Sequence, residues 1–452
     1  MAISDLHPAR RAARALAVAA LLLPLAGCRP ARSPDVVVVL VDTLRADRLG
    51  VEGYPLPATP AIDAVAREGV HFTRAYSAST WTKPAIASLF TGLHPSEHGI
   101  RRQLRETGHK VRSQRLPESL PTLAEQFRAG GWTTLGTVRQ VNLREKYGFS
   151  RGFDHWEMPR GADAFAMVDA FLASLDRAGR DKPVFGYLHV IDVHWPYEER
   201  LPDLAEDAFG PIGPEDRGHV EREAIQAARR EKFAGFDVAA LAAAYDHGVA
   251  FTDRAIGQLV EGLRQRGRWK DTLFVVTSDH GEGFLEHGRL EHTFAPYDEV
   301  ARIPLVVRLP ERRAPPPGAR RSIVSLTDLG PTLLELAGLP PWEGVSGRSF
   351  AGVVAGTEDD GRSAWIESED ARALRRGDTK VMRRWRRVHF WNLAADPQER
   401  HDLAAGGCEG PCAEEHRRLQ AFAHALRPPP GDAGAAAATD DEVAELRALG
   451  YL

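Results

Sequence analysis

The sequence lacks an excess of either charge and lacks internal repeats. Its 58 Lys and Arg residues nearly balance 62 Asp and Glu residues, which leaves a net charge of −4. Nucleic-acid binders usually carry a strongly basic face, so this balance argues against that class of partner. No repeating unit is apparent, as a solenoid or propeller would require. The remaining composition, 43% apolar and 27% charged over 452 residues, is typical of a globular chain with one large domain and a smaller one.

Cysteine is scarce, and one of the three cysteines ends the longest apolar stretch. Three arginines precede the run ALAVAALLLPLAGC, which closes at Cys28. The run is too short and too early for a membrane-spanning helix, whereas its basic flank and small final residues are typical of a secretion signal. LAGC resembles the bacterial lipoprotein box, so we predict a signal peptide over 1–27, lipidation of Cys28 and a linker over 28–34. An ordinary signal peptide with an incidental cysteine is the alternative.

A lipidated Cys28 would place the protein in the bacterial cell envelope, held to the membrane by acyl chains and facing the periplasm or the exterior. The other two cysteines, Cys408 and Cys412, lie in GGCEGPCAEE. Because such a compartment is oxidising, we predict a local disulfide between them. A metal site at these cysteines is disfavoured, since no complementary Cys/His pair stands nearby.

Apolar runs that alternate with helix-like segments indicate the fold class. The β-branched run VVVVLV at 36–41 is typical of a strand buried on both faces. Further strands are predicted at 133–138, 184–191, 272–278 and 304–309, and helices at 59–69, 121–131 and 237–267. This alternation predicts a doubly wound α/β domain over 35–355.

After about residue 355 the sequence changes to short polar and basic segments. We predict a small antiparallel subdomain over 356–410, and a tail with a short terminal helix over 411–452. The basic segment 372–387 is interpreted as a solvated hairpin, with a surface for anionic lipid or polysaccharide as the alternative.

Acidic and histidine residues follow three of the predicted strands. Asp42 follows the first, Asp192 and His194 follow a second, and Asp279 and His280 follow a third. Ligands in open α/β sheets bind outside the carboxyl ends of the strands, where these side chains would meet. Carboxylate oxygens and an imidazole nitrogen form a usual ligand set for a divalent metal. The alternative is that each aspartate only forms a turn.

Several histidines are candidates for contact with a substrate. Asp192 and His194 share a face of an extended segment, so His194 is a candidate donor to a substrate oxygen. A structural histidine before Pro196 is the alternative. His287 and His292 follow in EGFLEHGRLEHTF, and one of them could reach the site, although lone histidines more often lie in packing or at the surface.

Thr82 lies near the start of a predicted helix with an unusual first turn, WTKPAIASLF. Pro84 favours the first turn, which places Thr82 at or just before the N-cap. A helix N-terminus suits an anionic ester, and a hydroxyl coordinated to a divalent metal becomes a usable nucleophile. The alternative is that Thr80 and Thr82 only cap the helix.

Seven segments together resemble one family. They are VDTLRADRLG, TPAIDAVAREGVHFTRAYS, WTKPAIASLFTGLHPSEHGI, SDHGEGF, SLTDLGPTLLELAG, FWNLAADPQERHDLA and the terminal LRALGYL. In this order they resemble the sulfatase group of the alkaline-phosphatase superfamily. The resemblance implies an alkaline-phosphatase-like mixed sheet flanked by helices, with a bound divalent metal. It also implies the following roles: Asp42, Asp279 and His280 as metal ligands, Thr82 as nucleophile and ligand, and His194 and His292 as contacts to the ester oxygens or proton donors to the leaving group.

The nucleophile segment departs from that family. Sulfatases carry Cys or Ser, oxidised to formylglycine, in a Cys/Ser-x-Pro-x-Arg pattern, which here is replaced by Thr82-Lys83-Pro84-Ala85-Ile86. Threonine has no route to that aldehyde, and Ile86 stands in place of the sulfate-binding arginine. The paired aspartates of calcium-dependent members are replaced by Asp42-Thr43. These changes resemble the Thr-nucleophile phosphodiesterases and phosphoethanolamine transferases of the superfamily.

We therefore expect a metal-dependent hydrolase, or a group transferase, of phosphate, phosphonate or sulfate esters through a metal-bound Thr82, with phosphorus esters favoured. Lys83, Asp192 and His287 are expected to contact substrate, with a solvated surface position as the alternative for Lys83. The metal is Mn, Zn or Ca, as one ion or two. The substrate is a small-molecule, glycan or lipid ester, and the oligomeric state is not predicted. A strict sulfuric ester hydrolase and a non-catalytic envelope binding protein on the same scaffold are the alternatives.

Overall fold

The computed structural model describes residues 33–101, 105–107, 110–197, 237–428 and 434–448. The predicted signal peptide, Cys28 and nearly all of the predicted linker lie outside these residues. The chain divides into two units, 1–33 and 34–452, and all that follows concerns the second. Within the described residues, no helix has the length and apolar character needed to cross a membrane.

An eight-stranded mixed sheet forms the centre of the second unit, in the order β13-β2-β12-β9-β1-β8-β6-β7. Strand β1 pairs in parallel with β8 and β9, whereas β12 runs antiparallel to β9 and β2. The bounds are β1 Asp35–Val41, β2 Val70–Phe72, β6 Thr133–Val138, β7 His155–Glu157, β8 Val184–Val190, β9 Thr272–Thr277, β12 Leu305–Arg308 and β13 Gly318–Arg320. All five predicted strands are present, and the predicted doubly wound mixed α/β fold is confirmed.

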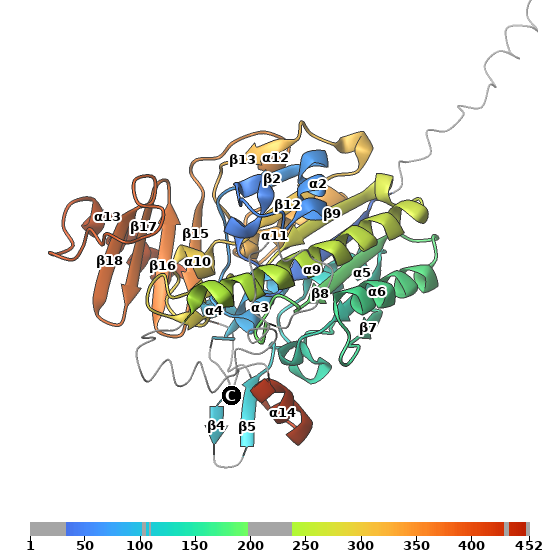
Figure 1. Ribbon diagram of the computed structural model, residues 1–452, viewed down its shortest axis with the longest axis horizontal. Coiled ribbons are helices and arrows are strands. Elements are labelled where there is room, and N and C mark those ends of the chain that lie inside the picture. Colours follow the sequence, from blue (N-terminus) through green and yellow to red (C-terminus); the bar gives the residue numbers. More distant parts are fainter. Residues whose placement is uncertain (1–32, 102–104, 108–109, 198–236, 429–433, 449–452) are drawn as a thin grey trace, which may run out of the picture. The chain divides into compact units, whose positions relative to one another are not determined.

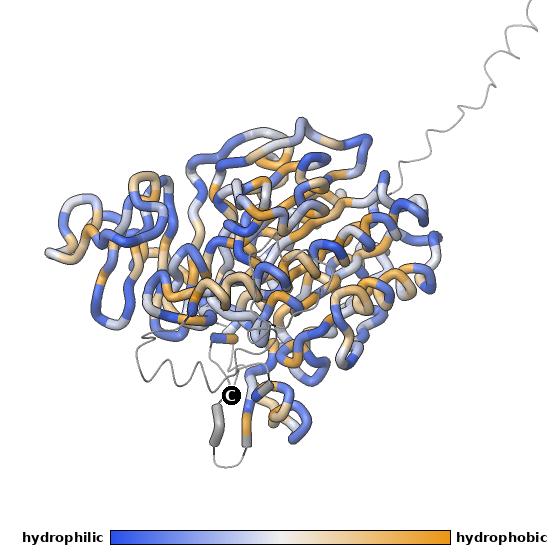
Figure 2. The backbone as a smooth tube through the Cα atoms, viewed as in Figure 1, coloured by the Kyte–Doolittle hydropathy of each residue, from blue (hydrophilic) through white to orange (hydrophobic). Residues whose placement is uncertain are grey.

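Helices cover both faces of this sheet, because β1 is apolar on both sides. Val37, Val39 and Val41 pack into one core with α2 Pro60–Glu68, α6 Ala164–Ala178 and α9 Val238–Gln265. The alternate residues Val36, Val38 and Leu40 pack into a second core with α3 Thr82–Thr91, α5 Leu123–Ala129 and α11 Leu326–Ala337. Figure 1 shows α9 and α6 along one face, and Figure 2 shows the apolar strands between the layers. Alternate residues of β1 point to opposite faces of the sheet and therefore belong to two separate cores.

The remaining short elements lie around this sandwich. They are the helices α4 Pro95–His98, α10 Asp298–Ala301 and α12 Ala351–Val354, and the strand pairs β3 Ala75–Tyr76 with β14 Val324–Ser325 and β10 Gly283–Phe284 with β11 Leu290–Glu291. Six 3-10 turns complete this set: Ala46–Arg48, Gly50–Glu52, Val141–Leu143, Glu145–Tyr147, Trp269–Asp271 and Glu311–Arg313.

The C-terminal subdomain is a four-stranded antiparallel sheet with one helix on it. Its strands are β15 Ser363–Glu367, β16 Ala371–Arg376, β17 Thr379–Arg384 and β18 Arg387–Asn392, and its helix is α13 Pro411–Ala425. The ring of Phe422 on α13 stacks on Trp365 at 4.7 Å, and Cys408 and Cys412 form a disulfide. We predicted that this subdomain ends at 410; the structure extends it through α13, because the apolar side of that helix packs on the sheet.

The last described segment returns to the catalytic domain. Strand β19 Ala435–Ala437 pairs with β5 Lys110–Gln114, which also pairs with β4 Arg105–Thr107. Helix α14 Asp440–Ala448 follows and lies beside β5 in Figure 1. We name residues 434–448 the C-terminal strap. The terminal helix was predicted, but strand pairing by an alanine run was not, because its partner lies more than 300 positions earlier.

Candidate active site

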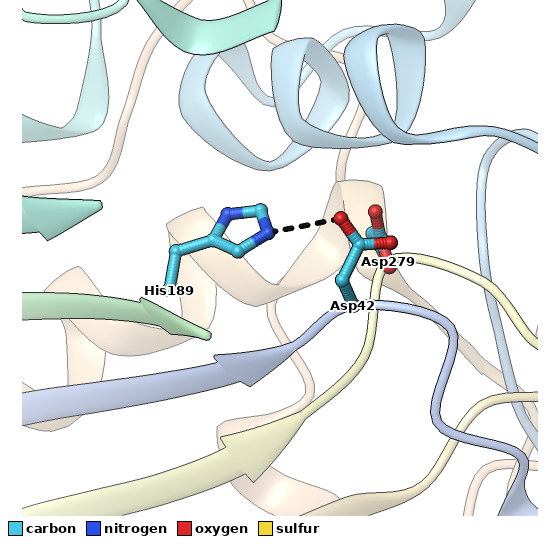
Figure 3. A group of neighbouring side chains, drawn as sticks. All are labelled: Asp42, His189 and Asp279. Atoms are coloured by element: carbon cyan, nitrogen blue, oxygen red, sulfur yellow. Dashed lines mark hydrogen bonds and ion pairs between the residues drawn. The ribbon is translucent and has the colours of Figure 1, made fainter. Parts of the chain in front are cut away.

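Four side chains meet at the carboxyl edge of the main sheet. Asp42 follows β1, Gln140 follows β6, His189 lies near the end of β8, and Asp279 follows β9. All four are buried, and these strands are neighbours in the sheet. Figure 3 shows Asp42 between His189 and Asp279. The sheet order therefore brings polar groups from four separate segments to one place, as open α/β sheets do at this edge.

Asp42 is held by two donors on one carboxylate oxygen. The Gln140 amide donates to Oδ2 at 2.7 Å, and His189 Nε2 lies 3.3 Å from the same oxygen. Because an ionised carboxylate oxygen only accepts, His189 donates to Asp42 from Nε2, and its Nδ1 accepts from the Tyr187 hydroxyl 3.0 Å away. Burial by itself would raise the pKa of Asp42, but the hydrogen bond from His189 and the neighbouring histidines hold it below its ordinary value.

Asp279 is held by main-chain donors. Its Oδ1 accepts from the Thr43 amide at 3.2 Å and from the His280 amide at 3.0 Å. Thr43 adopts a left-handed conformation with φ of 59°, and its hydroxyl donates to the Asp42 carbonyl at 2.7 Å. Burial and the charge of Asp42 raise the pKa of Asp279 to about 7. Two buried carboxylates side by side disfavour a second negative charge, which a cation would relieve.

His280 presents an unprotonated nitrogen to the nucleophile candidate. Its Nδ1 lies 2.9 Å from the Gly281 carbonyl, which only accepts, so this nitrogen carries the proton of the neutral ring. Nε2 then has a free lone pair and lies 3.3 Å from the Thr82 hydroxyl oxygen. Burial lowers the pKa of His280, which favours this neutral ring. The ring is therefore oriented to accept a proton or to bind a metal.

The remaining carboxylate oxygens fit a cation. Among the described residues, Asp42 Oδ1 and Asp279 Oδ2 have no hydrogen-bond partner, although both are fully buried. They lie 3.8 Å and 3.4 Å from His280 Nε2. Two orphaned anionic oxygens around one imidazole nitrogen match the donor set of a divalent transition metal. One nitrogen of His189 lies within 4.8 Å of a carboxylate oxygen of each aspartate, but its Nε2 proton is donated to Asp42, so His189 supports that carboxylate.

Thr82 is the first residue of helix α3 and is fully buried. The N-cap residue is Trp81, whose side chain makes no capping hydrogen bond. The sequence predicts Thr82 at or just before the N-cap, so the helix begins one or two residues earlier than expected. The first turn of a helix presents unpaired amide groups and the positive end of its dipole. An anionic ester beside Thr82 would meet both.

Two further histidines lie on the outer side of His280. The His292 ring lies 4.4 Å from that of His280, and the His194 ring lies 5.1 Å from that of His292. His292 Nδ1 lies 3.2 Å from Glu282 Oε1, and the Tyr197 hydroxyl donates to the other Glu282 oxygen at 2.8 Å. Burial raises the pKa of Glu282 to about 7 and, together with the charge of His194, lowers that of His292 to about 3. The rings of His280, His292 and His194 therefore follow one another, with Glu282 bonded to His292.

The structure does not place all expected substrate contacts in this cluster. Asp192 faces Arg139 at 3.6 Å. His287 stacks on Tyr297 at 3.6 Å and lies 2.8 Å from Glu299, on the side of the C-terminal subdomain. These two residues lie outside the Asp42–Thr82–His280 group.

Lys83 points away from the cluster although it follows Thr82 in the chain. It is fully buried; its Nζ donates to the Ser113 hydroxyl and lies 3.7 Å from the centre of the Tyr147 ring. Burial lowers the pKa of Lys83 well below its ordinary value. Lys83 therefore links helix α3 to strand β5.

Sequence reasoning missed three residues of the site. His189 is the one histidine in the otherwise apolar strand VFGYLHV, and Gln140 follows a strand by the same rule that identified Asp42. Glu282 stands two residues after His280 in SDHGE. A polar residue inside a buried strand was the signal for His189, because a buried polar group needs a hydrogen-bond partner.

A cavity of about 520 Å³ opens beside the cluster. It is bounded by Gln140 and His194 from the site, by Met158 and Arg160 from the loop after β7, and by helix α14. Its size is that of a typical pocket for an organic ligand. The buried cluster thus has a space next to it for the larger part of a substrate.

Two family descriptions match this chain. The family described as "Sulfatase" matches residues 34–339, and "N-sulphoglucosamine sulphohydrolase, C-terminal" matches residues 285–409. The first match covers more than half of the chain and includes Asp42, Thr82 and Asp279.

Known proteins agree with these matches. The chain is 26% identical to an ulvan-active sulfatase of Formosa agariphila, over 71% of this chain and 65% of that protein. It is 23% identical to a Delta 4,5-hexuronate-2-O-sulfatase of Bacteroides thetaiotaomicron, over 87% of this chain and 89% of that protein. Among solved structures, the phosphonate monoester hydrolase of Agrobacterium radiobacter superposes with a TM-score of 0.67 at 22% identity, covering 87% of this chain and 94% of that one. This last likeness shows the shared fold.

Proposed function

This chain belongs to the sulfatase family and is an ester hydrolase of the sulfatase and alkaline-phosphatase superfamily, and we propose that it cleaves phosphorus esters with Thr82 as its nucleophile. One observation carries the proposal. The Thr82 hydroxyl lies at the first position of α3, 3.3 Å from the unprotonated Nε2 of His280, and this nitrogen lies 3.8 Å from Asp42 and 3.4 Å from Asp279. A threonine that served only the helix would need neither neighbour.

Asp42, Asp279, His280 and Thr82 would hold the divalent cation on which the family depends. When bound there, the cation supplies positive charge that lowers the pKa of a neighbouring hydroxyl and balances charge on the ester oxygens. Gln140 and His189 orient Asp42 through its other oxygen. Such supporting contacts keep a ligand in its binding geometry.

The chain's own residues would carry out the displacement in two steps. Thr82 Oγ1 loses its proton to solvent and attacks phosphorus, so that a Thr–O–P bond forms while the bond from phosphorus to the leaving oxygen breaks. The leaving oxygen takes a proton from His194, because burial favours the neutral form of the neighbouring His292. Water then attacks the phosphothreonine and gives its proton to the same imidazole. As the Thr–O–P bond breaks, the Thr82 oxygen takes a proton from solvent, which restores its hydroxyl and releases the phosphate or phosphonate. An alcohol in place of water would make the protein a transferase.

The residues around Thr82 support phosphorus over sulfur. Formylglycine forms from Cys or Ser, and Thr82 has neither side chain. Ile86, which replaces the arginine of the formylglycine pattern, is fully buried in the apolar core and brings no charge to the ester. The curated relatives are named sulfatases, whereas one structural neighbour is a phosphonate monoester hydrolase. A sulfate ester hydrolase is therefore the competing outcome of the assay.

A side-by-side assay tests the choice of ester. Purified protein receives Mn, Zn or Ca and is given 4-nitrophenyl sulfate, 4-nitrophenyl phosphate, bis(4-nitrophenyl) phosphate and 4-nitrophenyl phenylphosphonate. We expect kcat/KM for at least one phosphorus ester to exceed that for the sulfate by a large factor. Faster turnover of the sulfate would overturn the choice of phosphorus. Absence of bound metal together with absence of turnover would instead identify a binding protein on this scaffold.

We also propose that Cys28 is lipidated and holds the protein in the bacterial envelope. The LAGC motif after a short apolar run supports this location. Mass spectrometry of the membrane fraction should find an acylated Cys28 at the new N-terminus, and Cys28→Ala should release the protein from that fraction. A soluble wild-type protein would contradict the proposal.

A further inference from the structure

The C-terminal strap is anchored to strand β5. Strand β19 adds to β5 through the pairs Ala435 with Gln114 and Ala437 with Arg112. The amides of Arg115 and Ala438 extend this ladder, with hydrogen bonds of 2.7 Å to Gly434 and 2.9 Å to Val111. A ladder of this kind fixes both the position and the direction of the helix that follows.

One side of helix α14 is buried against the catalytic domain. Glu442 is 2% exposed and forms ion pairs with Lys146 and with Arg144, the latter at 3.6 Å. Leu446 is 1% exposed and packs with Val111 and Val141. Because Glu442 and Leu446 are four residues apart, they lie on one face and orient the helix.

The other side of α14 forms a wall of the cavity. Asp441, Ala444 and Glu445 are exposed and line it, opposite the strand-end residues Ile191 and Trp195. His194 and Gln140 lie in the same lining, so the cavity connects α14 to the candidate active site. Ala444 lies between the two acidic residues and has the smallest side chain of the three. The helix thus presents the small side chain of Ala444 to the cavity, with the carboxylates of Asp441 and Glu445 on either side as hydrogen-bond acceptors.

We propose that helix α14 is the specificity wall for the leaving group of the ester. The inference rests on the proposed function, since it takes the leaving group to extend from the reacting phosphorus past His194 into this cavity. The ring of the leaving group packs between Ala444 and the apolar surface of Ile191 and Trp195. Its hydroxyl groups donate to Asp441, and Arg160 on the opposite loop binds its acceptors. An uncharged or weakly charged ring alcohol fits this lining, because acidic and basic residues both face the space.

The test uses one variant that fills the cavity and one that does not. Ala444→Trp places an indole in the space, whereas Arg447→Trp adds the same side chain at an exposed position of α14 that does not line the cavity. Both are made in the full-length chain with Thr82→Ala, so that an ester is bound without turnover. Calorimetry with Mn present measures the binding of 4-nitrophenyl phosphate, which carries a ring, and of inorganic phosphate, which does not.

We expect Ala444→Trp to weaken the binding of 4-nitrophenyl phosphate at least tenfold and to change that of phosphate less than twofold. Arg447→Trp should change neither by more than twofold. The proposal is overturned if Ala444→Trp leaves the ester affinity unchanged or weakens phosphate equally. It is also overturned if the Thr82→Ala parent binds phosphate but not the ester. A protein that cleaves none of the four esters would refute the proposed function, whereas the binding comparison would still decide whether α14 forms the wall.

Discussion

The hydroxyl oxygen of Thr82 lies 3.3 Å from Nε2 of His280, although 198 positions separate the two residues in the chain. The start of helix α3 and the end of strand β9 meet at this point. Because the Gly281 carbonyl takes the Nδ1 proton of His280, the nitrogen that faces Thr82 is the one with a lone pair. The contact therefore places the Thr82 hydroxyl beside a nitrogen that can accept a proton or bind a metal.

Loss of the Thr82 hydroxyl should abolish turnover. We expect Thr82→Ala to lower kcat by about 10³-fold or more, because the attacking atom is removed. Thr82→Ser keeps that atom and should retain measurable activity. Steady-state kinetics on the best phosphorus ester measures both. Thr91→Ala, on the same helix with its hydroxyl bonded to the Ala87 carbonyl, is the matched control and should stay near wild type. Full activity of Thr82→Ala would disprove the mechanism.

Gln140 should support the binding of the metal. Its amide donates to Asp42 at 2.7 Å, so Gln140→Ala leaves that carboxylate less well oriented. We expect metal affinity to fall by about 10- to 100-fold, as for other residues that support a ligand. Calorimetric titration of the metal-free protein with Mn or Zn measures the change. Gln258→Ala, whose amide contacts Asp169 at the surface, is the control. Equal affinities for Gln140→Ala and wild type would contradict the assignment.

A divalent cation should stabilise the protein. The orphaned oxygens of Asp42 and Asp279 face each other in the buried site, and a cation that binds only the folded state stabilises it by about 2.7 kcal/mol at 100 times its Kd. Thermal melting after chelation and after re-addition of metal should show this gain, and Asp279→Asn should remove it. Asp271→Asn changes an exposed aspartate and should leave it intact. A melting temperature that does not respond to any of the three metals would refute the site.

Lys380 should make the largest single ion-pair contribution to the stability of the contact between the catalytic domain and the C-terminal subdomain. It is fully buried, with its Nζ 2.8 Å from both Asp298 and Glu399. Lys380→Met leaves two buried carboxylates without their cation, so we expect a loss of about 3–5 kcal/mol in the free energy of unfolding. Denaturant titration measures it. Lys270→Met, at an exposed position, should change the value little. A loss under 1 kcal/mol would show that the two acids find other partners.

Lys83 distinguishes a substrate contact from a structural one. Its ammonium group points to Ser113 and the Tyr147 ring, away from the Asp42 cluster. We therefore expect Lys83→Met, which keeps most of the side-chain volume, to change KM for a phosphorus ester less than threefold. Initial-rate kinetics decides the matter. A tenfold rise in KM with kcat unchanged would restore the role in substrate binding that the sequence suggested.

Much of the site followed from local patterns. The β-branched run of β1 and the apolar runs of β8 and β9 predict buried strands, and parallel strands place their carboxyl ends at one edge. Asp42, Asp279 and His280 could therefore be assigned to one site before the structure was known. The family itself followed from motif order, and its match to residues 34–339 confirms it.

Other parts of the site depend on contacts between distant segments. Whether Lys83 points to the ester or to Ser113 depends on how β5 packs against α3, and no residue near position 83 encodes that packing. The partner of His189 could be identified only in the folded chain, because β8 lies beside β1 there and brings the ring to Asp42. The C-terminal strap pairs with a strand more than 300 residues earlier, and alanine has little preference for strands.

The sequence by itself determined the strands, the edge at which the chemistry collects and the threonine in place of a formylglycine precursor. These features depend on side-chain type and on periodicities of two and 3.6 residues, which are local. Only the tertiary structure decided which oxygens of Asp42 and Asp279 remain without partners, which nitrogen of His280 faces Thr82 and which helix forms the wall of the cavity. Hydrogen-bond direction and burial depend on all neighbours at once, and those neighbours come from segments that the chain brings together only when it folds.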